Sequence, residues 1–239
     1  MIADAGIGVT AIVFGACVGS FLSTVAVRAV SGQPWSAGGS RCDSCAQPLP
    51  LWRTVPLLSY TFNAGRCRRC QASIPLLHPI GELTGIGIAG LVLVSASPSD
   101  ALQVACLGAL LLAIALYDAA TMRIPDVLTF SLALVGVVTA WAGETLIEGA
   151  IAATAGLLVL STVKIGFRRS RGGEGLGWGD VKMVGALGLW LGAQLPLALA
   201  VASGLGLCWS VILRRVGRFP FGPFLAIGAY LVFWVGLAT

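Results

Sequence analysis

The chain has 239 residues, of which 57% are hydrophobic and only 10% are charged. Its mean hydropathy of +0.92 excludes an ordinary soluble domain and predicts an all-α polytopic membrane protein. A net charge of +5 would suggest nucleic acid as the partner of a soluble protein. In a membrane protein the placement of the charges matters more than their sum, and we expect no nucleic-acid partner.

Eight apolar runs follow one another along the chain and predict about eight transmembrane helices in a lipid bilayer. They cover approximately residues 7–27, 80–95, 101–117, 127–141, 146–163, 181–191, 197–213 and 221–237. The first run has Asp4 before it and no basic region, so we interpret it as a mature span rather than a cleaved signal. The fourth and sixth runs are shorter than the ~20 residues that cross a ~30 Å hydrocarbon core. Seven spans are therefore the alternative.

Basic residues are confined to alternate loops. If the eight runs alternate in direction, one side of the membrane receives residues 28–79, 118–126, 164–180 and 214–220. These segments contain 14 of the 15 lysines and arginines, and the last one, Lys182, lies two residues beyond the third segment. The positive-inside rule places these segments in the cytoplasm and both termini outside. We interpret the basic run Lys164–Arg171 as an anchor that meets anionic lipid at the membrane surface.

The first cytoplasmic segment contains two Cys-x-x-Cys pairs, Cys42/Cys45 and Cys67/Cys70, separated by 21 residues. This spacing is typical of a four-cysteine zinc site, in which each pair supplies two corners of a tetrahedron. A segment of about 50 residues also lacks an apolar core of its own, so a metal would stabilise it. Two disulfides or four unrelated thiols are the alternatives, and a cytoplasmic location disfavours disulfides. We predict a first span, a zinc domain and a membrane core at residues 1–28, 29–79 and 80–239.

Two aspartates stand at the edges of apolar runs, where an ionisable group is a candidate for function. Asp118 ends the third run, and a helix C-terminus is unfavourable for a carboxylate. Asp180 begins the sixth run after the glycine-rich stretch 172–179, where a helix N-cap is compatible with function. The predicted topology brings both aspartates to the cytoplasmic face. Two neighbouring carboxylates share one proton, so that one activates water while the other protonates an amide oxygen, as in aspartic proteases.

The neighbours of these aspartates have simpler interpretations. Asp126 follows Pro125 at the start of a predicted helix, and we favour helix capping over catalysis for it. Lys182 follows Asp180 by two residues and points to another face of the helix, so its part in holding a carboxylate charged is open. No rival catalytic set is present, because the chain has a single histidine, His78, and its glycine run lacks the Gly-Lys-Ser ending of a phosphate loop.

In combination, these motifs resemble those of the prepilin peptidases, the bifunctional leader peptidase and N-methyltransferase enzymes of type IV pilus and type II secretion systems. The matching segments are Gly19–Leu22, the two cysteine pairs around Pro56–Tyr60, Asp118–Asp126 with its Ile-Pro-Asp ending, and Gly177–Lys182. The last segment contains Gly-x-Gly-Asp, which other intramembrane aspartyl proteases share. The combination covers most of the chain in the order of the family, and it is specific.

The resemblance implies that Asp118 and Asp180 are the catalytic pair of an aspartic endopeptidase. Residues implied to support them are Gly177, Gly179, Asp126 and Lys182. The substrates would be type IV prepilins or pseudopilins, whose basic leader is cut after a glycine at the cytoplasmic face of the bacterial inner membrane. The resemblance also implies that the new N-terminus is methylated from S-adenosylmethionine. That step would need the loop in which Cys42, Cys45, Cys67 and Cys70 hold a structural Zn²⁺.

One departure from the family lies at the start of the second run. The chain reads His-Pro-Ile-Gly-Glu over residues 78–82, where the family commonly has Tyr-Pro-x-Val-Glu. Glu82 is an acid inside an apolar run and therefore a candidate for substrate binding or methyl transfer. A partnership with a neighbouring arginine is the alternative.

Two other classes of function use the same residues. A proton-coupled transporter would need intramembrane acids, but it is typically built from inverted repeats with its acids near the bilayer midplane. The sequence contains no evident repeat, and both aspartates map to the membrane edge. A non-enzymatic scaffold with a zinc loop would explain the cysteines but would leave Asp118 and Asp180 without a role. We therefore favour the peptidase.

Overall fold

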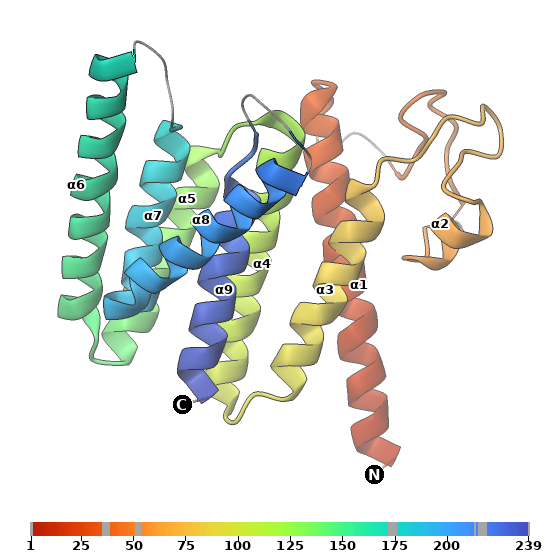
Figure 1. The fold of residues 1–239 in the computed structure, drawn as a ribbon. Coiled ribbons are helices and arrows are strands. Elements are labelled where there is room, and N and C mark those ends of the chain that lie inside the picture. The colour runs from red at the N-terminus through yellow and green to blue at the C-terminus, as the bar shows by residue number, and fades with distance from the viewer. Residues whose placement is uncertain are drawn as a thin grey trace. The chain divides into compact units, whose positions relative to one another are not determined.

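The computed structural model describes residues 2–34, 39–50, 54–171, 176–212, 214 and 219–238. The described residues are mainly helical and contain no strand beyond two isolated bridges, Arg41–Pro48 and Arg66–Ser73 (Figure 1). The helices are α1 (Ile2–Val30), α2 (Leu58–Phe62), α3 (Leu77–Leu93), α4 (Pro98–Thr121), α5 (Asp126–Ala142), α6 (Leu146–Arg171), α7 (Trp178–Leu191), the short 3-10 helix η2 (Gly192–Gln194), α8 (Leu195–Ile212) and α9 (Gly222–Ala238). Residues 172–175 of the glycine-rich stretch lie outside the described residues.

Each predicted apolar run coincides with an apolar helix. Four stretches are long and apolar enough to cross a membrane, namely Gly6–Val30, Pro98–Thr121, Leu146–Ser170 and Trp178–Ile212. The last of these includes α7, η2 and α8, while α3, α5 and α9 are apolar but shorter. The chain is therefore a multi-pass helical membrane protein, and eight separate crossings stay a prediction. No pattern in the sequence predicts the five-residue helix α2.

The chain divides into two compact units, Met1–Ala105 and Cys106–Thr239. In the first unit, α1 packs against α3 through glycines spaced four residues apart. A Cβ atom on Gly19 would lie 2.0 Å from the carbonyl oxygen of Gly81, and one on Gly85 would lie 2.1 Å from that of Gly15. Such small residues let two membrane helices touch along their backbones. The predicted boundaries at residues 28 and 79 divide the chain by its position relative to the membrane, and not by its packing into compact units. These boundaries stay a prediction.

Helix α7 is the buried centre of the second unit. It contacts α5, α6 and α9, and most of its side chains from Val181 to Leu191 are buried. The ring N–H of Trp190 donates a hydrogen bond of 2.9 Å to the carbonyl of Leu132 in α5. The same ring meets Phe233 of α9 edge-on, with ring centroids 5.8 Å apart. The first turn of α7, which carries Asp180, is therefore attached to a tightly enclosed helix.

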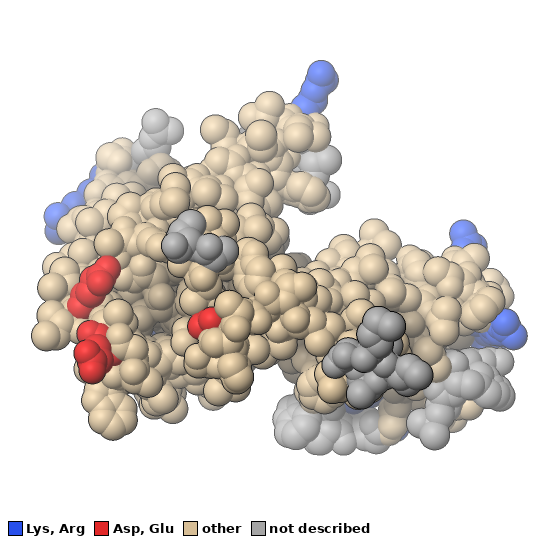
Figure 2. Space-filling view, turned by 90° about the horizontal axis from the view of Figure 1, so that it is seen from below, with Lys and Arg blue, Asp and Glu red and all other residues tan. Residues whose placement is uncertain are grey.

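The two ends of the second unit differ in charge. One end of this unit is drawn uppermost in Figure 1. It contains the last residues of α4 and α6 and the first residues of α7 and α9. Figure 2 looks from the opposite side, where acidic side chains are visible on the surface and basic side chains lie only at the margin. Glu144 lies in the α5–α6 connection, and Glu148 lies in the first turn of α6. This asymmetry agrees with the alternation of loops assumed for the positive-inside rule.

Candidate active site and metal centre

Asp118 lies one turn before the end of α4, and its side chain is only 5% exposed. Its Oδ2 atom accepts a hydrogen bond of 2.8 Å from the backbone N–H of Gly222. Gly222 is the first residue of α9, where backbone N–H groups have no partner within the helix and the helix dipole is positive. The start of α9 therefore offsets the unfavourable position of Asp118 near the end of α4.

Gly222 is a site residue that the sequence analysis did not identify. A Cβ atom there would lie 2.8 Å from Oδ2 and 3.0 Å from Cβ of Asp118. Any other residue at this position would displace the carboxylate or the start of α9. The available signal is a Gly-Pro pair at the start of the last apolar run, which indicates a helix start but gives no reason for the glycine itself.

Asp180 is the third residue of α7, and not its N-cap as the sequence suggested, because Gly177 is the N-cap. The Asp180 Oδ2 atom accepts a hydrogen bond of 3.2 Å from the backbone N–H of Gly177, as the third residue of a capping box does. A Cβ atom on Gly177 would lie 2.9 Å from this Oδ2 atom, and one on Gly179 would lie 2.9 Å from Cβ of Ile124. The first glycine therefore makes room for the carboxylate, and the second for the α4–α5 connection.

Asp118, near the end of α4, and Asp180, in the first turn of α7, come from helices that are distant in sequence. The charge of Asp118 acts on Asp180, and so does the ammonium of Lys164 in α6. Asp118 is buried, whereas Asp180 is partly exposed. Two interacting carboxylates in different surroundings can divide the roles of general acid and general base between them. The arrangement is suited to hydrolysis of an amide bond.

Lys182 pairs with Asp126 rather than with Asp180. Its Nζ atom lies 2.6 Å from Oδ1 of Asp126, and the two side chains are 50% and 76% exposed. Ion pairs as exposed as this contribute little to stability. Asp126 is the first residue of α5, whose N-cap is Pro125 and has no side-chain cap bond. The expected cap by Asp126 is therefore replaced by an ion pair that ties the start of α5 to the start of α7.

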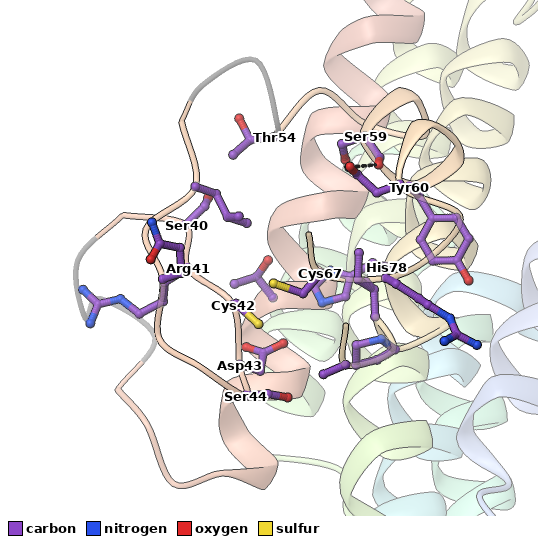
Figure 3. Close-up of a pocket in the computed structure, with 18 of the residues that line it drawn as sticks. Ser40, Arg41, Cys42, Asp43, Ser44, Thr54, Ser59, Tyr60, Cys67 and His78 are labelled. Carbon is purple, nitrogen blue, oxygen red and sulfur yellow. Dashed lines mark hydrogen bonds between the residues drawn. The ribbon is translucent and has the colours of Figure 1, made fainter. Parts of the chain in front are cut away.

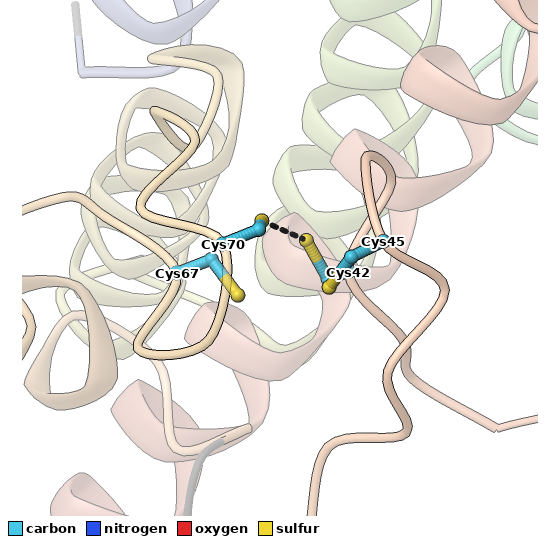
Figure 4. A group of neighbouring side chains, drawn as sticks. All are labelled: Cys42, Cys45, Cys67 and Cys70. Carbon is cyan, nitrogen blue, oxygen red and sulfur yellow. Dashed lines mark hydrogen bonds between the residues drawn. The ribbon is translucent and has the colours of Figure 1, made fainter.

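The four cysteines of the loop form one cluster (Figure 4). The sulfur atoms of Cys42, Cys45, Cys67 and Cys70 all lie within 4.8 Å of one another, and all four are free thiols. The Sγ atoms of Cys42 and Cys70 are 3.8 Å apart, much farther than the ~2.05 Å of a disulfide bond. A tetrahedron with zinc–sulfur bonds of ~2.3 Å has edges of about 3.8 Å. The cluster could therefore hold a metal such as zinc.

The two cysteine pairs occupy turns of the same design. In the first turn, the N–H of Cys42 donates to the carbonyl of Gln47, and the N–H of Ala46 donates to the carbonyl of Cys42. In the second turn, the N–H of Cys67 donates to the carbonyl of Ala72, and the N–H of Gln71 donates to the carbonyl of Cys67. Ala46 and its equivalent Gln71 both have a positive φ, 55° and 59°. The side chain of Arg69 donates a hydrogen bond to that of Gln47 and so joins the two turns.

The local backbone also prepares one thiol for a metal. Backbone N–H groups of Cys70 and Arg69 donate hydrogen bonds to the Cys67 sulfur and lower its pKa to about 6. Burial raises the pKa of Cys42 to about 11. The thiolate is the form that binds a metal. The backbone therefore favours the metal-binding form of Cys67, and metal binding would release the proton of Cys42.

A cavity of about 220 Å³ lies beside the cluster in the first unit (Figure 3). Two charged side chains that line it, Arg28 of α1 and Glu82 of α3, are each only 5% exposed. The Glu82 Oε2 atom accepts a hydrogen bond of 2.7 Å from the backbone N–H of Leu57, which precedes α2. Arg28 donates to the carbonyl of Gly39 at 3.3 Å. The two buried charges thus attach the loop to the helices and also face the cavity.

These features define a polytopic helical membrane protein with a pair of carboxylates in one unit and a thiol cluster in the other. Two family models match the chain. The one described as the bacterial peptidase A24 N-terminal domain matches residues 13–96, and the one described as the type IV leader peptidase family matches residues 105–211. The first match lies within the first unit, and the second begins at its last residue.

Curated relatives match over most of their length. A prepilin leader peptidase/N-methyltransferase of Burkholderia pseudomallei (strain K96243) is 36% identical over 95% of this chain and 84% of its own. Proteins of the same name from Aeromonas salmonicida (strain A449) and Neisseria gonorrhoeae are 35% and 33% identical, over 80% and 81% of this chain and 69% and 70% of theirs. A search of solved structures gave no match. The chain belongs to the type IV leader peptidase family, which confirms the resemblance of its motifs.

Proposed function

We propose that this chain removes the leader of type IV prepilin-like proteins with Asp118 and Asp180 as its catalytic pair, and then methylates the new N-terminus. Membership of the family, whose relatives are named for both activities, supports the two reactions. One observation carries the assignment of the peptidase site. The buried carboxylate of Asp118 is fixed by Gly222 at the start of α9, and its charge acts on the carboxylate of Asp180.

The chemistry needs one proton shared between the two carboxylates. The ionised one takes a proton from water as the water oxygen attacks the scissile carbonyl carbon, and the protonated one gives its proton to the carbonyl oxygen. The resulting diol then breaks the carbon–nitrogen bond, and the leaving amine takes up a proton. Both carboxylates return to their starting state, so no co-reactant other than water is required.

The end of the second unit that carries the pair is suited to a substrate held at the membrane surface. Helix α4 ends and helices α7 and α9 begin there (Figure 1), and Asp180 is open enough to receive water. The distribution of lysine and arginine along the chain supports a cytoplasmic location of this end at the bacterial inner membrane. The basic leader of a prepilin or pseudopilin would be cut after its glycine on that side.

The first unit is the better place for methyl transfer. When bound, S-adenosylmethionine supplies an electrophilic methyl group. The cavity offers a cation, Arg28, for a carboxylate group, and an anion, Glu82, for an ammonium or a substrate amine. The aromatic ring of Tyr60 also lines it, as Figure 3 shows. The four cysteines would hold a structural Zn²⁺ and keep the loop folded over this cavity.

A direct test uses the purified chain in lipid nanodiscs and a synthetic prepilin that contains the leader and the first hydrophobic segment. Mass spectrometry should show a product that lacks the leader, and a second product heavier by one methyl group when S-adenosylmethionine is added. Cleavage should proceed without S-adenosylmethionine. The relative from Aeromonas salmonicida, tested on the same substrate, is the positive control. An intact substrate after incubation with this chain, under conditions where the relative cleaves it, would overturn the proposal.

A further inference from the structure

Lys164 is buried where a lysine of a membrane anchor should be exposed. It begins the basic run at the end of α6, and Arg168 and Arg169 of that run are exposed, as expected for a surface anchor. The Lys164 side chain, in contrast, is only 4% exposed. An ammonium inside a membrane helix is costly unless it is paired with a charge or with backbone carbonyls. Its partners therefore indicate its role.

Among the described residues, the partners of Lys164 lie at or just before the start of α7. Its Nζ atom donates a hydrogen bond to the carbonyl of Leu176 and lies 5.1 Å from the centroid of the Trp178 ring, within the range of a cation–π interaction. The same charge acts on the carboxylate of Asp180. Leu176 precedes the N-cap of α7, and Trp178 and Asp180 are its first and third residues. One side chain from α6 thus contacts both the residue before the N-cap and the first residue of α7.

We propose that Lys164 is a positioning residue that fixes the first turn of α7 and so holds the Asp180 carboxylate in its place in the catalytic pair. This inference rests on the proposed peptidase function and deepens it. Lys164 contacts Leu176 and Trp178, which flank Gly177, and the N–H of Gly177 binds the Asp180 carboxylate. A shift of this turn would therefore move the carboxylate.

Asp118 is held independently of Lys164, because its Oδ2 atom accepts a hydrogen bond from the N–H of Gly222 in α9. Lys164 exchanges no proton and does not touch the substrate, so it acts through Asp180 and the backbone that positions it.

The test compares steady-state cleavage of the same prepilin by three variants in nanodiscs. Lys164→Met removes the charge but keeps the length of the side chain, and Lys164→Arg keeps the charge. Arg168→Met is the matched control, because Arg168 lies one turn along the same face of α6 but is exposed. We expect Lys164→Met to lower kcat roughly 100-fold with little change in KM, since misplacement of a catalytic group costs about that much. Lys164→Arg should recover most of this loss, and Arg168→Met should cleave like the wild type.

Wild-type cleavage in the same preparation tests the proposed function separately from this inference. An unchanged kcat in Lys164→Met, or equal losses in Lys164→Met and Lys164→Arg, would overturn the role of Lys164 while the wild type still cleaves. Thermal unfolding in detergent checks that each variant folds. If Lys164→Met does not fold, Trp178→Leu decides, because it removes the ring that the ammonium faces. A lower kcat at constant KM supports the inference, and an unchanged kcat contradicts it.

Discussion

At the scale of single residues, the site depends on carboxylates whose stabilising partners come from elsewhere in the chain. Asp118 is held by the first N–H of α9, and Asp180 by Gly177 and Lys164. The aspartates could be identified from the sequence, because an acid at the edge of an apolar run is rare. The groups that hold these aspartates could not be identified in this way. A backbone N–H leaves no sequence signal, and a buried lysine within a basic run has the same pattern as an exposed one.

The glycine at position 222 gives a sharp prediction. Gly222→Ala should lower prepilin cleavage roughly 100-fold, because the new Cβ would lie 2.8 Å from Oδ2 of Asp118 and displace the carboxylate. Methylation of a substrate that has already been cleaved should continue. The matched control is Gly204→Ala in α8, where a Cβ atom meets nothing within 4 Å. The measurement is the rate of cleavage per folded enzyme, and near-normal cleavage by Gly222→Ala would show that Asp118 does not need this position.

At the scale of helices, the fold uses close contacts between small residues. The hydrophobic runs predicted where helices lie. They could not predict that α1 meets α3 through backbone contacts, because the apolar residues of both runs would be equally stable in contact with lipid. The spacing of the cysteines was more informative. Four thiols that bind one ion must converge, so the sequence constrained their arrangement directly. The hydrogen bond between Glu82 and Leu57, in contrast, could not be predicted, because no sequence spacing is typical of such a contact.

The contact between α1 and α3 can be tested by two alanine substitutions. Gly19→Ala would place a Cβ atom 2.0 Å from the carbonyl oxygen of Gly81, whereas Gly87→Ala on α3 meets nothing within 4 Å. Overpacking of this kind typically costs about 1–3 kcal/mol. We expect Gly19→Ala to lower the temperature of unfolding in detergent and to reduce methyl transfer, because the cavity is built on these two helices. Equal unfolding temperatures for the two variants would contradict the packing described for α1 and α3.

At the scale of the whole molecule, the chain combines two units that match two family models and, on our proposal, two reactions. Composition was sufficient to predict a multi-pass helical membrane protein, and the alternation of its loops across the membrane stays a prediction. Composition and charge were not sufficient to settle the number of crossings, because α3, α5 and α9 are shorter than a typical span. Membership of the family favours the peptidase over the transporter and scaffold alternatives.

Loss of the metal should affect the two reactions unequally. Cys67→Ser removes the ligand whose pKa is already low, and we expect it to lower the zinc content of the purified protein. Methyl transfer should then fall more steeply than cleavage, because the cluster lies beside the cavity of the first unit. Cys208→Ser is the matched control, since Cys208 is an exposed thiol of α8 outside the cluster. The zinc content and the two activities should be measured on one preparation. A larger loss of cleavage than of methyl transfer would refute the prediction.

The central claim is that Asp118 and Asp180 form the catalytic pair. The most direct measurement is cleavage of a prepilin by wild type, Asp118→Asn and Asp180→Asn, with methylation of a pre-cleaved substrate followed in the same samples. Asparagine keeps the size of each side chain but can neither ionise nor carry the shared proton. We predict that both variants lose cleavage and retain methyl transfer. Normal cleavage by either variant would remove that aspartate from the pair and contradict the account.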